Sequence, residues 1–258
     1  MSTPQDHLFR RKKYVLGVRK IIAVASGKGG VGKSTVAVNL AATLHHTGSN
    51  VGILDADIYG PSLPTMLGLG TKPEVSEQKK LIPLRAYGMK VMSIGFMVPE
   101  ESPIIWRGPM VQSAFLQLLF DVAWSPLDYL ILDMPPGTGD IQLTLAQQVH
   151  IDGVVIVSTP QDIALIDARK SFHMFRKVDV PVLGMIENMS VFECPHCYHT
   201  THIFSHHGAR KQANALGIPF LGEIPLDLSI REGGDKGKPA VLENRKILEI
   251  YRKIIENL

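Results

Sequence analysis

The amino-acid sequence predicts an α/β fold, in which a doubly wound, mostly parallel sheet carries helices on both faces. Short apolar runs rich in β-branched residues alternate along the chain with segments of helical periodicity. Strands that are buried on both faces of a sheet have this composition. A glycine-rich loop joins the first apolar run to the first helical segment, and open parallel sheets bind ligands beyond the ends of their strands.

The strands and helices can be placed from periodicity and from turn residues. The first strand is expected at residues 21–25. A helix is expected from Val36 to His46, because its apolar residues share one face and Gly48 can end it. Five further strands are expected at residues 51–54, 129–132, 154–157, 182–186 and 220–224.

One domain accounts for most of the chain. The 258 residues, of which 45% are hydrophobic, are enough to bury one large core. We expect a flexible tail at residues 1–16 and a single domain at 17–258. Residues 60–105 contain many prolines and glycines, so we expect an insertion there, with a small hairpin around Lys90 to Gly95.

The glycine-rich loop has the spacing of a phosphate-binding loop, or P-loop. Glycines let successive backbone N–H groups and the N-terminus of the next helix converge on a polyphosphate. Lys33 can reach the β- and γ-phosphates, and the hydroxyl of Ser34 can hold Mg²⁺. A glycine-rich turn without a ligand would leave both residues unexplained. The sequence therefore predicts a nucleotide site formed by Gly27, Lys28, Gly29, Gly30, Val31, Gly32, Lys33, Ser34 and Thr35.

Acidic residues follow two of the other expected strands. Asp55-Ala56-Asp57 follows the strand at 51–54, and Asp133 follows the strand at 129–132. Asp133 fits the carboxylate that acts on Mg²⁺ in P-loop NTPases. Gly137, four residues later, offers an amide near the γ-phosphate in a loop that could reorganise on hydrolysis. A lone aspartate at a strand end is more often a cap, but two such strands beside a P-loop favour the catalytic interpretation of Asp133.

Composition limits the remaining classes of function. The formal net charge of +3 gives no argument for a specific nucleic-acid partner. No apolar run approaches the length of a membrane span, and Met1 to Lys20 lacks the apolar core of a secretory signal. The two cysteines exclude a disulfide framework and favour a reducing compartment. We therefore expect a soluble cytoplasmic enzyme, as in a bacterium, or alternatively a processed chain of the mitochondrial matrix.

Cys194 and Cys197 form a pair whose spacing suits metal chemistry. Two thiols in one turn can hold one edge of an iron–sulfur cluster, and a symmetric dimer would supply the four thiolates that a cluster takes. A dithiol redox switch is weakened by the position of the pair deep in a P-loop domain. Structural zinc is the serious rival, because five histidines that could complete a knuckle lie nearby, at His196, His199, His202, His206 and His207.

Lys28 is a second lysine within the P-loop, directly after its first glycine. The form K-G-G-x-G-K-[ST] resembles the deviant P-loop of the MinD/Mrp/ParA class of ATPases. That resemblance implies a homodimer that sandwiches two nucleotides, in which Lys28 reaches the partner's phosphates while Lys33 acts within its own chain. The alternative is a solvated loop lysine without such a role.

The motifs taken together resemble a narrower family. The P-loop, the segment 54–62, the run from Asp133 to Asp140, Ser158-Thr159-Pro160-Gln161-Asp162, Glu187-Asn188-Met189-Ser190 and the cysteine pair occur in this order. This arrangement, from about Gly17 to about Ala240, is similar to the Mrp/ApbC family of iron–sulfur carrier ATPases, including its mitochondrial NUBPL type.

The family resemblance implies a function and two further residue roles. It implies a homodimer that binds and hydrolyses ATP, carries a labile [4Fe–4S] cluster at its interface and donates the cluster to apoproteins. It assigns Asp57 to positioning the attacking water and Asn188 to contact with adenine. Trp106-Arg107-Gly108-Pro109 also matches the family, but the residues indicate no physical role.

A second class of function stays open, that of a positioning or partitioning ATPase of the MinD/ParA type, which acts on a membrane or on DNA. Such an ATPase has no use for a cysteine pair, so Cys194 and Cys197 favour the carrier. The stretch Ile247 to Leu258 is amphipathic and basic, as are membrane-binding terminal helices of MinD-type proteins. Its narrow apolar face, which lacks Phe and Trp, instead favours packing against the domain.

Overall fold

The structure is a computed structural model that describes residues 12–97 and 108–258 of the chain. Residues 1–11, which make up most of the tail expected at 1–16, lie outside the described residues. So do Trp106 and Arg107 of the motif that ends at Pro109.

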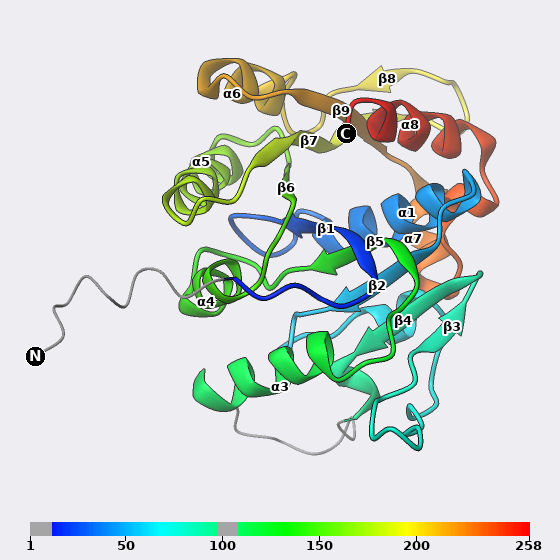
Figure 1. Cartoon of the computed structure of the whole chain (residues 1–258). Helices are drawn as coiled ribbons and strands as arrows, with labels where there is room; N and C mark the ends of the chain where they lie inside the picture. The colour runs from blue at the N-terminus through cyan, green and yellow to red at the C-terminus, as the bar shows by residue number, and fades with distance from the viewer. Residues whose placement is uncertain (1–11, 98–107) are drawn as a thin grey trace, which may run out of the picture.

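A single sheet forms the centre of the molecule, as Figure 1 shows. Its strands follow the order β3-β4-β2-β5-β1-β6-β7-β8, and β9 also pairs with β7. All pairs are parallel except β3 with β4 and β7 with β8. The strands are β1 (Val18–Ala25), β2 (Val51–Asp55), β3 (Leu84–Ala86), β4 (Met89–Ser93), β5 (Leu127–Asp133), β6 (Gly153–Ser158), β7 (Val182–Glu193), β8 (Thr200–Thr201) and β9 (Phe220–Leu226).

Helices cover both faces of the sheet, which confirms the doubly wound α/β fold that the sequence predicts (Figure 1). One face carries α1 (Lys33–His46), α2 (Leu63–Met66), α7 (Leu228–Asp235) and α8 (Arg245–Glu256). The other face carries α3 (Gly108–Phe120), α4 (Asp140–Gln148), α5 (Asp162–Lys177) and α6 (Gly208–Leu216). Two short 3₁₀ turns complete the described elements, η1 (Ile94–Phe96) and η2 (Ala240–Leu242).

The expected strands are all present, and β7 is longer than its sequence indicates. Every residue of β2 and β6 is buried, as the apolar runs predict for strands covered on both faces. The sequence predicts that the strand beginning at Val182 ends at Ile186, whereas β7 continues to Glu193. Four of the seven added residues are polar. Pairing with β9 and β8 extends the strand through Glu187, Asn188, Phe192 and Glu193.

The hairpin expected around Lys90 to Gly95 lies earlier in the chain, so this prediction is wrong in position. β3 and β4 form the hairpin, and Tyr87 and Gly88 make its two-residue turn, with φ values of 50° and 84°. Positive φ at both central residues suits the twist of an antiparallel hairpin. Residues 89–93 belong to β4, which pairs in parallel with β2. Part of the segment 60–105 is therefore a strand of the central sheet.

The C-terminal helix α8 packs on the domain through its narrow apolar face. Ile247, Tyr251 and Ile254 are buried there, against β9 and α1. The sequence-based preference for packing is thereby confirmed for the described helix. Within residues 12–97 and 108–258, no helix has the length and apolar character needed to cross a membrane.

The parallel strands determine where a ligand site can form. β1, β2, β5 and β6 run in the same direction, so their carboxyl ends meet at one edge of the sheet. The loops that follow these strands include the P-loop, the loop after Asp55 and the loop after Asp133.

Candidate nucleotide and metal sites

The P-loop connects β1 to α1 and has the backbone shape that a phosphate cradle needs. Gly30 and Gly32 have φ values of 80° and 82°, a left-handed conformation that glycine adopts without strain. A side chain at Gly30 would meet no atom within 4 Å, so the loop faces open space there. At Gly27 a Cβ atom would instead collide with the backbone of α5 at Asp167. The glycine pattern therefore reflects both the turn and close packing.

Helix α1 begins earlier than the sequence indicates. It starts at Lys33, directly after the left-handed Gly32, rather than at Val36. Ser34 and Thr35 consequently lie in its first turn, where backbone N–H groups have no partner within the helix. The predicted residues Gly27 to Thr35 thus form one continuous loop and helix start, with amides available to an anion.

Lys33 forms a buried ion pair with Asp133. Its ammonium lies 2.6 Å from Oδ1 of Asp133 and also donates to the hydroxyl of Ser34 at 3.1 Å. The two charged side chains are 6% and 0% exposed. Burial raises the pKa of the Asp133 carboxyl, and the positive charge of Lys33 opposes this rise. Lys33 and Ser34 are adjacent in the sequence, and Asp133 lies far from both. The fold brings together these three residues, which the sequence predicts to act together.

The second carboxylate oxygen of Asp133 takes no part in the ion pair with Lys33. Oδ2 is inaccessible to solvent and has no hydrogen-bond partner in the part of the chain that the structure describes. An unpaired buried carboxylate oxygen beside a serine hydroxyl fits the hard oxygen ligands that Mg²⁺ takes. Ser34 and Asp133 are therefore suited to hold this ion, as the sequence predicts.

Asp55 is a functional residue that sequence reasoning missed. It is fully buried and lies beside Asp133, its register partner on the neighbouring strand. Burial, and secondarily the negative charge of Asp133, raise the pKa of Asp55 to about 7. Its side chain accepts four hydrogen bonds, from the amides of Asp57, Ser62 and Leu63 and from the hydroxyl of Ser93 at the end of β4.

Asp57 is held by that arrangement near the ion pair. Its backbone amide donates to Asp55 at 3.1 Å, which fixes the start of its loop. Burial raises the pKa of the Asp57 carboxyl, and the positive charge of Lys33 opposes the rise. Asp57 therefore lies within the electrostatic reach of the predicted phosphate-binding lysine.

Gly137 lies against the P-loop. Its φ of 91° is left-handed, and its amide donates to the carbonyl of Ser26 at 3.0 Å. A Cβ atom at this position would meet nothing within 4 Å. The amide that the sequence predicts near a γ-phosphate is thus engaged by the P-loop, and it would have to leave Ser26 to reach a phosphate.

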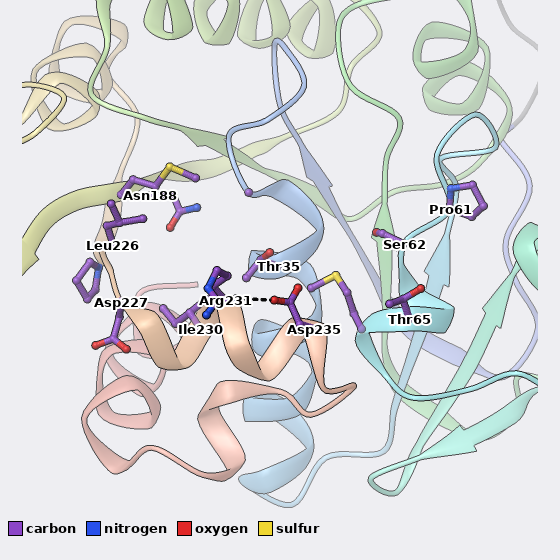
Figure 2. A pocket seen from close by; sticks show the side chains of 15 residues that line it. Thr35, Pro61, Ser62, Thr65, Asn188, Leu226, Asp227, Ile230, Arg231 and Asp235 are labelled. Carbon is purple, nitrogen blue, oxygen red and sulfur yellow. Dashed lines mark hydrogen bonds and ion pairs between the residues drawn. The ribbon is translucent and has the colours of Figure 1, made fainter.

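A cavity of about 600 Å³ adjoins the P-loop, and Figure 2 shows the side chains that line it. Asn188 of β7 reaches into this region and donates to the carbonyl of Val31 at 2.8 Å. Its amide also packs so closely on Gly32 that a Cβ atom there would collide with it. Asn188 therefore ties the strand that carries it to the P-loop, and its contact with adenine stays a prediction.

Helix α7 forms another wall of this cavity. Asp227 caps the helix, accepting from the amide of Ser229 at 2.8 Å, and Arg231 pairs with Asp235 at 2.8 Å. The pair is drawn as a dashed line in Figure 2. Both Asp227 and Arg231 also line the cavity.

Cys194 and Cys197 lie in the turn that joins β7 to β8. The amide of Cys194 donates to the carbonyl of His199 at 2.9 Å, and the amide of Tyr198 donates to that of Cys194 at 2.9 Å. Hydrogen bonds from the amides of Cys197 and His196 lower the pKa of the Cys194 thiol, and the Cys197 side chain adds to this effect. Cys194 is partly buried and Cys197 is exposed, and both are free thiols. The turn therefore presents one activated and one accessible sulfur.

No knuckle forms around this turn in the described part of the chain. Across residues 12–97 and 108–258, no third histidine, cysteine or acidic donor atom joins the two sulfur atoms within 4.8 Å. His202, His206 and His207 instead lie against one another, with ring centroids 3.9 Å and 3.5 Å apart along the series. The Cys₂His₂ set that the sequence leaves open is thus not assembled among the described residues.

Comparison with known proteins identifies relatives over nearly the whole chain. The model of a family described as ParA, a NUBPL iron-transfer P-loop NTPase, matches residues 17–258. The iron-sulfur cluster transfer protein NUBPL of Mus musculus is 54% identical over 256 residues, which cover 96% of this chain and 80% of that protein. The iron-sulfur cluster carrier protein of Escherichia coli strain K12 is 52% identical over 245 residues, which cover 94% of this chain and 66% of that protein.

Solved structures with the same fold include nucleotide complexes. A nucleotide-binding protein of Archaeoglobus fulgidus in complex with ADP is 41% identical, with a TM-score of 0.78 over 88% of this chain and 90% of that one. The cell division ATPase MinD of Pyrococcus furiosus has a TM-score of 0.67 at 22% identity over 93% of this chain and 98% of that one, which supports the fold alone.

The raised pKa of Asp55 predicts how stability depends on pH. Because the folded state keeps this proton to a higher pH than the unfolded state does, the free energy of unfolding should fall as the pH rises from about 4 through 7. Asp55→Asn cannot ionise and should show a shallower fall, measured by urea denaturation between pH 5 and pH 8. Asp133 and Asp57, whose pKa values are also raised, should contribute to the remaining slope.

Asp121→Asn is the matched control, because Asp121 is exposed. It should keep the slope of the unmodified protein. Equal slopes for Asp55→Asn and the unmodified protein would contradict the assignment.

Proposed function

The chain belongs to the family of NUBPL iron-transfer P-loop NTPases, and we propose that it is an ATP-hydrolysing carrier of a labile [4Fe–4S] cluster. Two copies hold the cluster between them and transfer it to apoproteins. The observation that carries this proposal is the turn at Cys194 and Cys197, which offers two thiols without a third donor in the described residues. A cluster of this type takes four thiolates, and a twofold dimer supplies them.

ATP binds, in this proposal, with its phosphates on the P-loop. The ADP complex of the Archaeoglobus relative supports a nucleotide there. A polyphosphate offers Lys33 a partner of higher charge than Asp133 does. When Lys33 turns to the phosphates, both oxygens of Asp133 become available. Mg²⁺ held by Ser34 and Asp133 would neutralise phosphate charge, and the unpaired Oδ2 of Asp133 supports this assignment.

The base of the nucleotide occupies the cavity beside the P-loop. Asn188 supplies a side-chain amide, which can both donate to and accept from the edge of adenine. Its present hydrogen bond to Val31 aligns it with the loop that holds the phosphates. Helix α7, through Ile230 and Arg231, closes the opposite wall.

Asp57 positions the attacking water. Its carboxyl lies in the field of Lys33 and on a loop that Asp55 fixes through several hydrogen bonds. A carboxylate in this position can orient a water in line with the γ-phosphate. Gly137 contributes an amide to the same phosphate after release from Ser26.

Lys28 acts on the nucleotide of the partner chain. It is only half-buried, and it forms no ion pair with any residue in the ranges 12–97 and 108–258. A lysine without a local partner next to a phosphate cradle is available to a second chain. The homodimer of this proposal thus completes the nucleotide site as well as the cluster site.

Transfer of the cluster follows from the chemistry of the turn. The lowered pKa of Cys194 favours the thiolate that binds iron, and the exposure of Cys197 leaves the bound cluster open to incoming thiolates of an apoprotein. Bacterial carriers and a mitochondrial iron-sulfur protein occur among the relatives. We therefore place the chain in the cytoplasm or the mitochondrial matrix.

Two substitutions separate binding from hydrolysis. Lys33→Ala should abolish hydrolysis and weaken ATP binding, because a buried cation against the phosphates is lost. Asp57→Asn should slow hydrolysis by about a hundredfold and leave ATP binding nearly unchanged, since only the water is misplaced. Steady-state hydrolysis and ATP titration measure the two effects, with Asp121→Asn as an inert control.

Lys33→Ala also leaves Asp133 buried without its cation, which can destabilise the fold. The thermal unfolding of this variant is therefore measured to establish that it is folded. An equal loss of ATP affinity in both folded variants would contradict the assignment of phosphate binding to Lys33 and of water positioning to Asp57.

The cluster itself is tested by anaerobic reconstitution with iron and sulfide. The dimer should take up about four irons, and either Cys194→Ser or Cys197→Ser should abolish stable uptake while hydrolysis survives at least in part. Tyr198→Asn, in the same turn, should keep the cluster. Absorbance, iron content and transfer to an apo-acceptor are the measurements. One tightly held zinc per chain and no cluster would overturn the carrier and leave an ATPase with a structural metal.

A further inference from the structure

A second group of metal-binding side chains lies where β7, β9 and the start of α6 meet, outside the nucleotide cavity and the cysteine turn. Glu187 on β7 and Glu223 on β9 are register partners on neighbouring strands. His207 directly precedes α6. One donor atom of each residue lies within 4.8 Å of the other two, the only such group among the described residues.

One of the three side chains is buried and held in place, and the other two are partly exposed. Glu187 is 1% exposed, and its Oε2 accepts from the amide of Ala209 at 2.7 Å, which fixes the carboxylate at the start of α6. The side chains of His207 and Glu223 are 36% and 42% exposed. Two carboxylates held this close repel each other, and a cation relieves that repulsion.

The contact between His207 and Glu223 is unsuited to a hydrogen bond. Nδ1 of His207 lies 3.5 Å from Oε2 of Glu223, is inaccessible to solvent and forms no hydrogen bond within the ranges that the structure describes. Hydrogen bonds to a ring nitrogen are shorter. Two ligands of one tetrahedral ion, each at about 2.0–2.1 Å, are separated by about 3.4 Å. The spacing of these two atoms therefore suits a shared ion.

The charged and titratable side chains next to Glu187, His207 and Glu223 make contacts of their own. Arg210, whose positive charge also acts on Glu187, lies over the ring of Phe220 at 4.2 Å. The ring of His206 lies against that of His207 at a tilt of 50°, and its Nδ1 lies 3.1 Å from that of His202. An ion pair between His207 and Glu223 alone is the competing explanation, and at 3.5 Å the contact between Nδ1 and Oε2 is longer than a hydrogen bond.

We propose that Glu187, His207 and Glu223 bind one divalent transition-metal ion of the class of Zn²⁺, Fe²⁺ and Co²⁺. An imidazole with two carboxylates suits these ions, whereas Mg²⁺ and Ca²⁺ prefer shells of oxygen alone. Three protein ligands leave a further coordination position of the ion to water. This site is independent of the cluster at Cys194 and Cys197.

Cobalt is the probe, because its absorbance reports coordination. The full chain carrying Cys194→Ser and Cys197→Ser serves as the parent, since it lacks thiolates that would bind the same ion. The parent should bind one Co²⁺ per chain. Glu223→Gln and His207→Asn should each weaken binding by about tenfold or more, and Co²⁺ should raise the melting temperature of the parent but not of these variants.

The variants are chosen to preserve the fold. His207 has a φ of 57°, a left-handed conformation that asparagine tolerates, and Glu223 is partly exposed. His150→Asn is the matched control, because His150 faces a single carboxylate, Asp152, at 3.4 Å. It should bind Co²⁺ as the parent does. Absence of binding to the parent, or unchanged affinity in both Glu223→Gln and His207→Asn, would overturn the proposal.

Discussion

A buried ion pair between Lys33 and Asp133 joins the P-loop to the strand next to it, and most of the nucleotide site is arranged around it. β1 and β5 are neighbours in the sheet and end at the same edge, which places the two side chains 2.6 Å apart. Removing one partner of such a pair typically costs about 3–5 kcal/mol, because the other charge stays buried. Asp55, beside Asp133 on β2, extends this arrangement to the loop that carries Asp57. The stability of the fold and the geometry of the site thus depend on the same groups.

Strand β7 links the two chemistries of the proposed function. It carries Asn188 at the nucleotide cavity and ends at Glu193, next to Cys194. Six residues of strand span about 20 Å at most, so one element connects the base of the nucleotide with the metal turn. In the proposed function a single chain supplies only half of each site. The side chain of Lys28 forms no ion pair with the described residues, and two thiols are half of what a cluster takes. We therefore propose that each chain contributes half of both sites to a pair.

The sequence predicted the parts of this structure that are encoded locally. The P-loop and the strands at its sides are contiguous segments, and their glycine spacing and apolar runs need no tertiary context. The length of β7 was missed because its second half mixes polar with apolar residues and is held by pairing with β8 and β9. The role of Asp55 was missed because its partners come from loops that only the folded chain brings around it. His207 was considered as a zinc ligand with the cysteines, whereas the fold places it with Glu187 and Glu223, which are distant in sequence.

Mixing subunits tests the half-site claim most directly. Lys28→Ala and Lys33→Ala chains should each be inactive alone. In their heterodimer, one composite nucleotide site has both lysines and the other has neither, so the mixture should recover part of the hydrolysis. Differently tagged chains, purified through both tags, establish that heterodimers form. Recovered hydrolysis in the doubly purified fraction is the result that the account predicts, and its absence at every mixing ratio would contradict it.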